Sequence, residues 1–540
     1  MTIHSMSGRR SVLVGATAVL AAGRAGPGFA AAEPVVETKQ GKVRGARQGG
    51  VLSFKGIRYG ETTGGANRFL PPVLAKPWAG IRDALTLPAS APQPPTSGRA
   101  LEAWYSTIQP VSEDCLFLNV FTPGVGRGRR PVMVWLHGGG WASCSGTAPG
   151  FDGTNLARGG DVVVVTINHR LNAFGYLNIG GGDPRFADAG NAGVLDMVAA
   201  LRWVRDNAAA FGGDPGNVTI FGQSGGAAKV TALMGMPAAK GLFHKAIAQS
   251  CSGGLRLDGM EESARQTNAL AEQLGLTKVT GAALQSVPMD QLIAATRKIA
   301  DPFRPVLDGR SFQANPFDPT APATAADVPL MIGNAATEAT LFMAADIANF
   351  SLDAAEVEKR VARYLGVDAA HTKRVIDAYG TAYKGASPSE LLAQIGTDYM
   401  YRRNTTRVAA LQAERAKSPV YAYVFDWKTP VLGGVLHSPH TLEVPFAFGT
   451  TATAPALLGT GPYLSKLTRD TMARWTSFAH TGVPTAPSGA KWAHYDTAGR
   501  STMMLDLESH LASNPGGEAR QALDDLPYFE YSRPASFVHA

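Results

Sequence analysis

Residues 217–226 read Asn-Val-Thr-Ile-Phe-Gly-Gln-Ser-Gly-Gly, an apolar stretch that runs directly into a Gly-x-Ser-x-Gly turn at Ser224. A serine hydroxyl is a poor nucleophile at neutral pH, so an enzyme that uses one holds it on an exposed, tight turn beside a base. Such a turn has a strand before it and a helix after it. Residues 218–221 predict the strand, and the small residues at 225–234 predict the helix. The stretch therefore predicts a nucleophile elbow with Ser224 at its tip.

Apolar runs of strand length recur along the chain, with helical stretches between them. The runs cover residues 132–136, 162–167, 218–221, 245–249, 329–332 and 421–425. Alternation of this kind predicts an α/β fold, in which a mostly parallel central sheet carries helices on both faces. The unbroken run Val-Val-Val-Val at 162–165 is typical of a strand that is buried on both sides.

Helical periodicity marks three further segments. Residues 190–211 place apolar side chains at helical spacing and predict an amphipathic helix that ends at Gly212 and Gly213. Long helical insertions are expected at 261–299 and 353–417. Because they interrupt the series of strands, we expect them to lie above the sheet and to shape a pocket there.

The N-terminal part of the expected domain has a different pattern. Residues 35–60 and 113–122 predict short antiparallel strands, joined through a Pro-rich loop at 88–110 that should lie at the surface. No internal repeat and no low-complexity linker interrupts the chain. We therefore expect a single domain over residues 33–540.

Residues 1–32 have the pattern of an export signal. The pair Arg9-Arg10 precedes an apolar run at 12–22, and three alanines end the segment before Glu33. The paired arginines favour a twin-arginine route. The apolar run is too short to span a bilayer, so we expect no stable membrane insertion. The expectation is an exported protein, periplasmic or secreted, whose signal peptide is cleaved near Ala32.

The composition of the chain argues against some classes of partner and cofactor. The chain has 540 residues, 45% hydrophobic content and a formal net charge of +7. Three arginines lie in the predicted signal, so the mature charge is about +4, and no basic stripe with interleaved aromatic residues is present. This argues against a nucleic-acid partner. No histidine or cysteine cluster has the spacing of metal ligands, so neither a metal nor an organic cofactor is expected.

The three cysteines cannot all pair with one another. Cys115 lies in the apolar run Cys-Leu-Phe-Leu-Asn-Val and is expected to be a buried small hydrophobe. Cys144 and Cys251 each follow a segment expected at the active site. A disulfide bond between these two is therefore one open possibility.

A glycine trio upstream of the elbow has the properties of an oxyanion loop. Residues 137–141 read His-Gly-Gly-Gly-Trp and follow a predicted strand. Successive glycines let the backbone approach a substrate closely, and backbone amides can stabilise a developing oxyanion without reorganising. We expect the amides of Gly139, Gly140 and Gly225 to form an oxyanion hole. Standing alone, the trio would be interpreted as a flexible turn.

These motifs, taken together, resemble the type B carboxylesterases of the α/β-hydrolase superfamily, which include bacterial para-nitrobenzyl esterase-like enzymes and the cholinesterases. The resemblance covers nearly the whole chain after residue 32. Besides the elbow and the glycine trio, it is carried by residues 54–59, 68–72, Trp78, 113–120 and 211–215. It implies an α/β-hydrolase fold with helical insertions over the active site, and hydrolysis of small carboxylic esters through an acyl-enzyme intermediate.

The same resemblance selects the two partners of the serine. His440 begins the segment His-Thr-Leu-Glu-Val-Pro-Phe, which is similar to the family's catalytic-histidine segment. His437 is the competitor, but it lacks the acidic residue and the proline downstream. Glu338 follows a predicted strand, in a segment similar to the one that supplies the family's catalytic acid. The chain order of serine, acid and histidine agrees with that of the fold.

Two aspartates remain alternative acids. Asp308 and Asp398 both resemble structural positions of the family and are therefore the weaker candidates. His137 resembles the residue before the oxyanion glycines and should order that loop. Pocket-lining candidates are Trp141, Gln223, Phe303, Leu341 and Phe342, which could equally belong to the core.

The chain departs from the family pattern at the elbow and at one cysteine. The family usually has Gly-Glu-Ser-Ala-Gly, where this chain has Gln223 before the serine and Gly225 after it. Loss of a carboxylate at Gln223 favours neutral or anionic esters over cationic ones. Glycine at 225 adds backbone freedom that could loosen the oxyanion hole or widen the acyl site. No cysteine precedes Cys115, so the family's usual disulfide cannot form and the loop at 88–110 is untethered.

Three other functions compete with an esterase. An amidase or a carbamate hydrolase could use the same triad, and the residues do not separate these activities from ester hydrolysis. A recognition protein on this fold could lack catalysis, but the presence of Ser224, Glu338 and His440 argues against it. A lipase is disfavoured because no long amphipathic lid is evident. The natural substrate and the oligomeric state are not specified by the residues.

Overall fold

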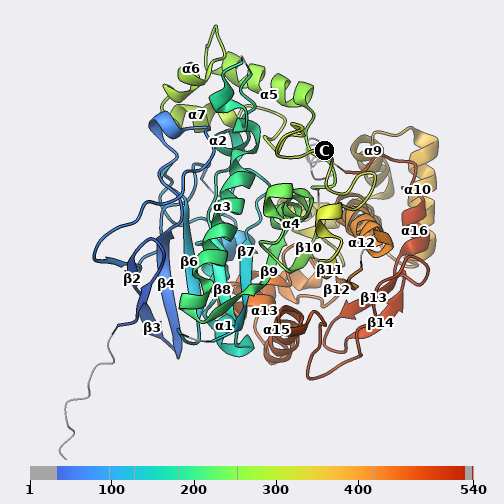
Figure 1. Ribbon diagram of the computed structural model, residues 1–540. Coiled ribbons are helices and arrows are strands. Elements are labelled where there is room, and N and C mark those ends of the chain that lie inside the picture. The colour runs from blue at the N-terminus through green and yellow to red at the C-terminus, as the bar shows by residue number, and fades with distance from the viewer. Residues whose placement is uncertain are drawn as a thin grey trace, which may run out of the picture. The chain divides into compact units, whose positions relative to one another are not determined.

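A large mixed sheet forms the centre of the structure (Figure 1). The computed structural model describes residues 33–95, 98–126, 128–180, 182–251, 253–415, 417–529 and Val538. Within these residues the sheet has eleven strands, in the order β14-β13-β12-β11-β10-β9-β7-β8-β6-β4-β3. Their bounds are β3 Ala46–Gln48, β4 Val51–Arg58, β6 Phe117–Thr122, β7 Arg130–Leu136, β8 Val163–Ile167, β9 Gly213–Gln223, β10 Lys245–Gln249, β11 Leu330–Ala335, β12 Val420–Phe425, β13 Ser501–Leu505 and β14 His510–Ser513.

The strands from β13 to β8 are parallel to their neighbours, and antiparallel pairs lie at both ends of the sheet. At the carboxyl end of β9, Gly222 is in register with Leu136 of β7, and Gln223 is in register with Gln249 of β10. Loops that follow parallel strands meet at one edge of a sheet, which is where such folds build their sites. The segments after β7, β9, β10 and β11 therefore converge.

Alternate side chains of the central strands enter two separate cores. Val134 of β7 and Ile220 of β9 belong to the core that α3, α4 and α12 cover. Trp135 and Phe221 belong to the core that α1, α13 and α15 cover. Successive side chains of a strand point to opposite faces, so a continuous apolar run is required when both faces are buried. The predicted α/β-hydrolase arrangement is confirmed.

The helices include the two predicted insertions. The first insertion forms α5, α6 and α7, and the second forms α9 to α12 with a π-helical turn at Asp398–Arg402. The α-helices are α1 Thr154–Gly160, α2 Asn172–Tyr176, α3 Ala192–Asn207, α4 Gly225–Gly235, α5 Met260–Gln273, α6 Gly281–Gln285, α7 Met289–Thr296, α8 Thr340–Met343, α9 Ala354–Leu365, α10 Ala369–Ala382, α11 Pro388–Thr397, α12 Arg403–Arg415, α13 Val444–Phe448, α14 Pro455–Leu458, α15 Tyr463–Thr481 and α16 Gly517–Gln521.

Some elements differ from the sequence-based expectation. The N-terminal region also forms a second, three-stranded sheet from β1 (Val35–Glu37), β2 (Lys42–Arg44) and β5 (Ile81–Asp83). All three residues of β5 are exposed, so no buried alternation marked this strand in the sequence. The helix predicted at 190–211 begins at Ala192 and continues as a 3₁₀ turn to Phe211, where Gly212 ends it with φ of 77°.

The part of the chain that the structure describes contains no helix long and apolar enough to span a bilayer. Residues 34–529 belong to one compact unit. The predicted signal at 1–32 lies outside the described residues.

Candidate active site

Ser224 occupies the turn between β9 and α4. Its backbone has φ of 60° and ψ of −123°, a conformation that non-glycine residues adopt only when the surroundings impose it. The Ser224 amide donates to the carbonyl of Gln249 at 2.8 Å, which ties the turn to the end of β10. A Cβ atom at Gly222 or Gly226 would lie 2.7 or 2.0 Å from the carbonyl oxygen of Leu136. Both glycines are therefore required for the turn to sit against β7.

Glu338 and His440 form a buried pair. Glu338 follows β11 and is fully buried, and its Oε2 accepts a hydrogen bond from Nδ1 of His440. The other carboxylate oxygen accepts from the Ser250 hydroxyl and from the Ala335 amide, both at 2.6 Å. Because both oxygens are occupied, the carboxylate is held in one orientation. It can fix the imidazole tautomer that carries its proton on Nδ1 and leaves Nε2 as the acceptor.

His440 is also contacted by groups from the elbow and from the second insertion. The side-chain amide nitrogen of Gln223 lies 3.2 Å from His440 Nε2, and the Tyr401 hydroxyl lies 3.5 Å from the same atom. The ring of Tyr401 is 4.6 Å from the imidazole, and the ring of Phe342 is 5.5 Å from it. The side chain of His440 is only 6% exposed, so aromatic side chains shield it from water.

The glycine trio forms a tight turn beside the elbow. Gly139 and Gly140 have φ of 78° and 61°, and the amide of Ser143 donates to the Gly139 carbonyl at 3.1 Å. A Cβ at Gly139 would lie 2.4 Å from the Ser143 carbonyl oxygen, and one at Gly225 would lie 2.3 Å from that of Gly140. Gly225 is the first residue of α4, where helix geometry leaves amide groups without a partner inside the helix. Glycine at these positions thus lets the trio and the helix end approach each other closely.

One cavity of about 520 Å³ contains Ser224, Gln223 and His440 together with all three glycines of the trio. Its walls are mostly apolar. The apolar lining residues are Pro94, Pro95, Trp104, Tyr105, Phe151, Leu341, Phe342 and Val444. Glu102 also lines this cavity, and its carboxylate is paired with Arg99. A cavity of this size and lining suits a small organic molecule.

A family model described as the carboxylesterase family matches residues 32–522. This chain belongs to the carboxylesterase family. It is 36% identical to para-nitrobenzyl esterase of Bacillus subtilis (strain 168) over 507 residues, 91% of this chain and 98% of that protein. It is 35% identical to phenmedipham hydrolase of Pseudarthrobacter oxydans, covering 85% of this chain and 92% of that protein.

Solved structures agree with this assignment. A carboxylesterase of Geobacillus stearothermophilus superposes with a TM-score of 0.79 at 36% identity, covering 90% of this chain and 99% of that one. The chain is accordingly a carboxylic ester hydrolase of the serine class with an α/β-hydrolase fold.

Two of the pocket residues expected in this carboxylesterase lie elsewhere. Trp141 and Phe303 are 4% and 2% exposed and belong to the hydrophobic core, and neither is among the residues that line the cavity. The Trp141 ring packs edge-on against Tyr176 at 5.3 Å. Gln223, Leu341 and Phe342 do line the cavity. A large aromatic side chain close to a catalytic motif in the sequence can either belong to the core or line the cavity. The sequence does not distinguish the two, because the difference depends on which segments pack around it.

The Pro-rich loop at 88–110 contributes to the cavity wall, whereas the first insertion at 261–299 does not. The Pro-rich loop was expected at the surface, with a role at the pocket mouth left open, and it supplies Pro94, Pro95 and the stretch around Trp104 to the cavity wall. No residue of the first insertion, α5 to α7, is among the lining residues, although all three helices are described. Among the described residues of the second insertion, only Tyr401 lines the cavity. The expectation that both insertions shape the pocket was therefore wrong for the first.

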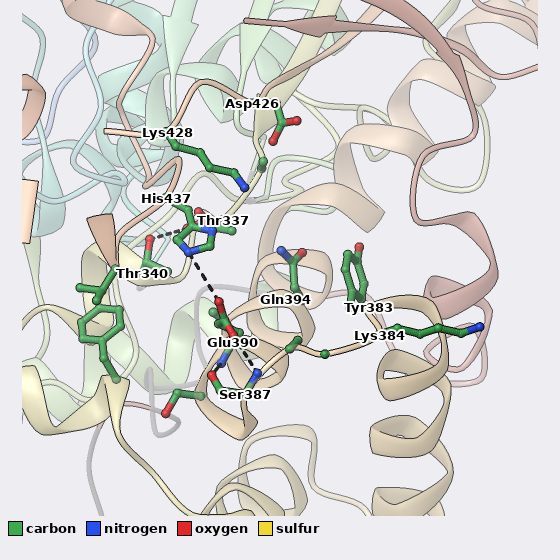
Figure 2. A pocket seen from close by; sticks show the side chains of 17 residues that line it. Thr337, Thr340, Tyr383, Lys384, Ser387, Glu390, Gln394, Asp426, Lys428 and His437 are labelled. Atoms are coloured by element: carbon green, nitrogen blue, oxygen red, sulfur yellow. Dashed lines mark hydrogen bonds and ion pairs between the residues drawn. The ribbon is translucent and has the colours of Figure 1, made fainter. Parts of the chain in front are cut away.

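The competing histidine lies in a different cavity, of about 620 Å³ (Figure 2). His437 has φ of 51°, and its Nε2 lies 3.6 Å from Glu390 of α11. Lys428 and Tyr383 line the same cavity, whereas Ser224 lines the other one. Burial, followed by the charge of Lys428, lowers the pKa of His437. His437 and His440 are thus only three residues apart in the sequence but line two different cavities.

The alternative acids have other partners. Asp308 accepts from the Asn191 side chain at 3.0 Å, and Asp398 accepts from the Tyr379 hydroxyl at 2.8 Å. Asp398 also pairs with Arg402 at 3.2 Å. His137 contacts its own loop through Nδ1, 3.0 Å from the Gly138 carbonyl. These positions have structural contacts of their own.

The cysteines are all reduced and buried, so the open possibility of a bridge between Cys144 and Cys251 is not realised. The Cys144 thiol instead donates to the Tyr105 carbonyl at 3.4 Å, and the Cys251 thiol to that of Gly253 at 3.0 Å. Burial raises the pKa of Cys144 to about 11 and that of Cys251 to about 12. Across the described residues no cluster of His, Cys, Asp or Glu could hold a metal ion.

Two buried ionisable residues at the site were given no role of their own in the sequence analysis, where Glu443 served only as part of the segment that selects His440. Glu443 is fully buried and receives a hydrogen bond from the Gln249 side chain at 3.1 Å. Burial, and secondly the charge of Glu338, raises the pKa of Glu443 to about 8. Lys229 is fully buried on α4, below the glycine trio. A lysine inside an otherwise small and apolar helix was the signal that could have drawn attention to it.

Proposed function

We propose that this carboxylesterase cleaves small esters through an acyl-enzyme intermediate on Ser224. In this reaction the Ser224 oxygen attacks the ester carbonyl carbon, and its proton passes to Nε2 of His440. Glu338 stabilises the resulting imidazolium, and the amides of Gly139, Gly140 and Gly225 bind the oxyanion. Collapse of the tetrahedral intermediate expels the alcohol, which takes the proton from His440. Water then repeats these steps on the acyl enzyme and releases the acid.

One observation supports this proposal above the others. The buried Glu338–His440 pair presents its imidazole to the cavity that also contains Ser224 and the glycine trio. The strained backbone of Ser224 is a second support, because strain of this kind is retained where a side chain must be aimed.

The expected substrates are neutral or anionic esters with apolar acyl or alcohol groups. The cavity is largely apolar, and Gln223 places a neutral amide where a carboxylate would attract cations. The charge of Glu102, an acidic residue that lines the cavity, is offset by its ion pair with Arg99. Activity should therefore decrease when a positive charge is added to an otherwise matched ester.

Substitution of the triad tests the assignment. Ser224→Ala and His440→Ala should each reduce hydrolysis of a short p-nitrophenyl ester by more than about a thousandfold while the protein stays folded. His437→Ala is the matched control, because it removes a second histidine only three residues away, and it should remain active. Retained activity in Ser224→Ala, or a loss in His437→Ala that His440→Ala does not show, would overturn the assignment.

Amide or carbamate hydrolysis by the same residues is the alternative. The similarity to a protein named phenmedipham hydrolase makes phenmedipham a rational test substrate. Matched ester, carbamate and anilide substrates that share one acyl group should be compared at one pH. A kcat/KM for the carbamate or the anilide that equals or exceeds that of the ester would favour the alternative.

We also propose that residues 1–32 direct export. The support is the sequence pattern alone: Arg9-Arg10, the apolar run and the alanines that precede Glu33. In an expression host with a twin-arginine system, the exported protein should begin near Glu33. Replacement of both arginines by lysine should retain the uncut chain inside the cell, and unchanged export of that variant would refute the assignment.

A further inference from the structure

Lys229 is a buried cation without an acidic partner. It lies on α4, five residues after Ser224, and its side chain is fully buried. Over the described residues no carboxylate lies within ion-pair distance of it. Burying a lone ammonium group costs considerable free energy, and a chain tolerates this cost only when other contacts offset it.

The contacts of Lys229 are directed at the oxyanion loop. Its Nζ donates to the carbonyl oxygen of His137 at 2.8 Å and to that of Gly138 at 3.4 Å. The Trp141 ring lies 5.8 Å from the same nitrogen, within the range of a cation–π contact. All three contacts belong to residues 137–141. The cation therefore binds the outer side of the loop whose inner side lines the cavity.

Each of these carbonyls shares a peptide unit with the next amide. The Gly138 carbonyl belongs to the same peptide as the Gly139 N–H, which is one of the donors assigned to the oxyanion hole. A cation bound to a carbonyl draws electron density from the peptide and makes its N–H a stronger donor, and hydrogen bonds in a chain reinforce one another in this way. The same contact restricts a loop whose glycines have little conformational preference of their own.

We propose that Lys229 is a positioning residue for ester hydrolysis, whose ammonium group fixes and polarises the oxyanion loop through the carbonyls of His137 and Gly138. This rests on the proposed function, because it assumes that the loop amides bind the oxyanion. Lys229 itself does not touch the substrate and acts only through the loop peptides.

Among the described ionisable groups around Lys229, only Lys229 itself is expected to change its charge near neutral pH. Burial lowers the pKa of His137 and of His169, whose rings stack at 4.8 Å, so both are neutral. Burial raises the pKa of the Cys144 thiol to about 11, so it is also neutral. Arg170, beyond His169, is neutralised by its bond to Asp196 at 2.6 Å. Burial lowers the pKa of Lys229 to about 7, so the loop should lose its cation as the pH rises through that value.

The test compares Lys229→Met with Lys245→Met. Lys245 is a half-buried lysine at the start of β10, and its Nζ donates to the Ala479 carbonyl at 2.9 Å. The control thus removes the same kind of bond at the start of β10, whereas the active site lies at the end of that strand. Lys229→Met should lower kcat for a p-nitrophenyl ester about 10- to 100-fold with little change in KM, less than the loss of a direct oxyanion donor. Lys245→Met should leave both constants near those of the unsubstituted enzyme.

An inhibitor pair separates oxyanion binding from general loss of structure. A trifluoromethyl ketone adds to the nucleophile and leaves an oxyanion in the hole, whereas the corresponding alcohol only occupies the cavity. In Lys229→Met the Ki of the ketone should rise with the fall in kcat, and the Ki of the alcohol should stay the same. The decrease in kcat/KM of the unsubstituted enzyme above about pH 7 should also disappear. A change in KM alone, or equal changes for both inhibitors, would overturn the proposal.

Lys229→Gln covers the case in which the methionine variant does not fold. Glutamine keeps an N–H donor but not the charge, so kcat should still fall and the step near pH 7 should still be lost. Full activity in Lys229→Gln would show that the charge is not needed. The Ser224→Ala variant distinguishes the two proposals: if it is inactive while both Lys229 variants are fully active, only the role of Lys229 is wrong.

Discussion

Replacing Gln223 by glutamate should restore a negative charge beside the proposed base. The side-chain nitrogen of Gln223 lies 3.2 Å from Nε2 of His440, and Gln223 is only 4% exposed. A carboxylate at this position would stabilise the protonated imidazole. The protonated form cannot accept the serine proton, so activity should be lost at a higher pH than in the unsubstituted enzyme.

The geometry sets the size of the effect. Two unit charges about 4 Å apart interact by about 1 kcal/mol in water and by about 4 kcal/mol at an effective dielectric constant near 20. One pH unit corresponds to about 1.4 kcal/mol, so the midpoint of the acidic limb should rise by about 1 to 3 units. Burial at position 223 opposes ionisation of the new carboxylate itself. The lower part of the range, about 1 unit, is therefore expected.

The assay is kcat/KM for a neutral p-nitrophenyl ester between pH 5 and pH 9, values chosen to span the usual titration range of histidine. Gln223→Met is the control, because it removes the amide without adding charge and should not raise the midpoint. The preference for a cationic over a neutral ester should also increase in Gln223→Glu alone. A midpoint that moves by less than about 0.3 units in the glutamate variant would refute the assigned contact between position 223 and the base.

Three further predictions concern groups around the triad. Gly225→Ala would place Cβ 2.3 Å from the Gly140 carbonyl oxygen, so the loop must move by about 1 Å, and kcat should fall about 100-fold. Undiminished turnover would show that the close approach is not needed. Ser250→Ala removes a 2.6 Å hydrogen bond to Glu338 and should lower kcat about 10-fold in steady-state assays. If the variant is as active as the unsubstituted enzyme, Ser250 does not help to hold the acid. Glu443 has a folded-state pKa raised to about 8, so the folded chain binds its proton more tightly than the unfolded one, and the free energy of unfolding should decrease as the pH rises from about 4.5 to 8. Glu443→Gln should flatten this dependence, by on the order of a few kcal/mol, in urea unfolding measured across that pH range; an unaltered slope would contradict the raised pKa.

The sequence predicted the features that depend on near neighbours in the chain. The strand, the turn and the helix around Ser224 follow from apolar and small residues within 217–234, and steric contact with Leu136 requires the glycines of the elbow. The continuous apolar strands predicted a sheet buried on both faces, and Trp135 and Val134 do enter opposite cores. Short, exposed strands such as β5 and β14 carry no such pattern and were missed.

By itself, the sequence determined the α/β architecture and the elbow, because backbone sterics and strand periodicity act over a few residues. The choice of Glu338 and His440 as partners of the serine rested on the resemblance to the carboxylesterase family. Tertiary structure alone decided which side chains meet. It placed His440 against Glu338, 102 residues away, while His437 turned into another cavity. It also sent Trp141 and Phe303 into the core and Lys229 beneath the oxyanion loop. Burial and electrostatic environment arise from segments distant in the chain, so they exist only once those segments have packed together.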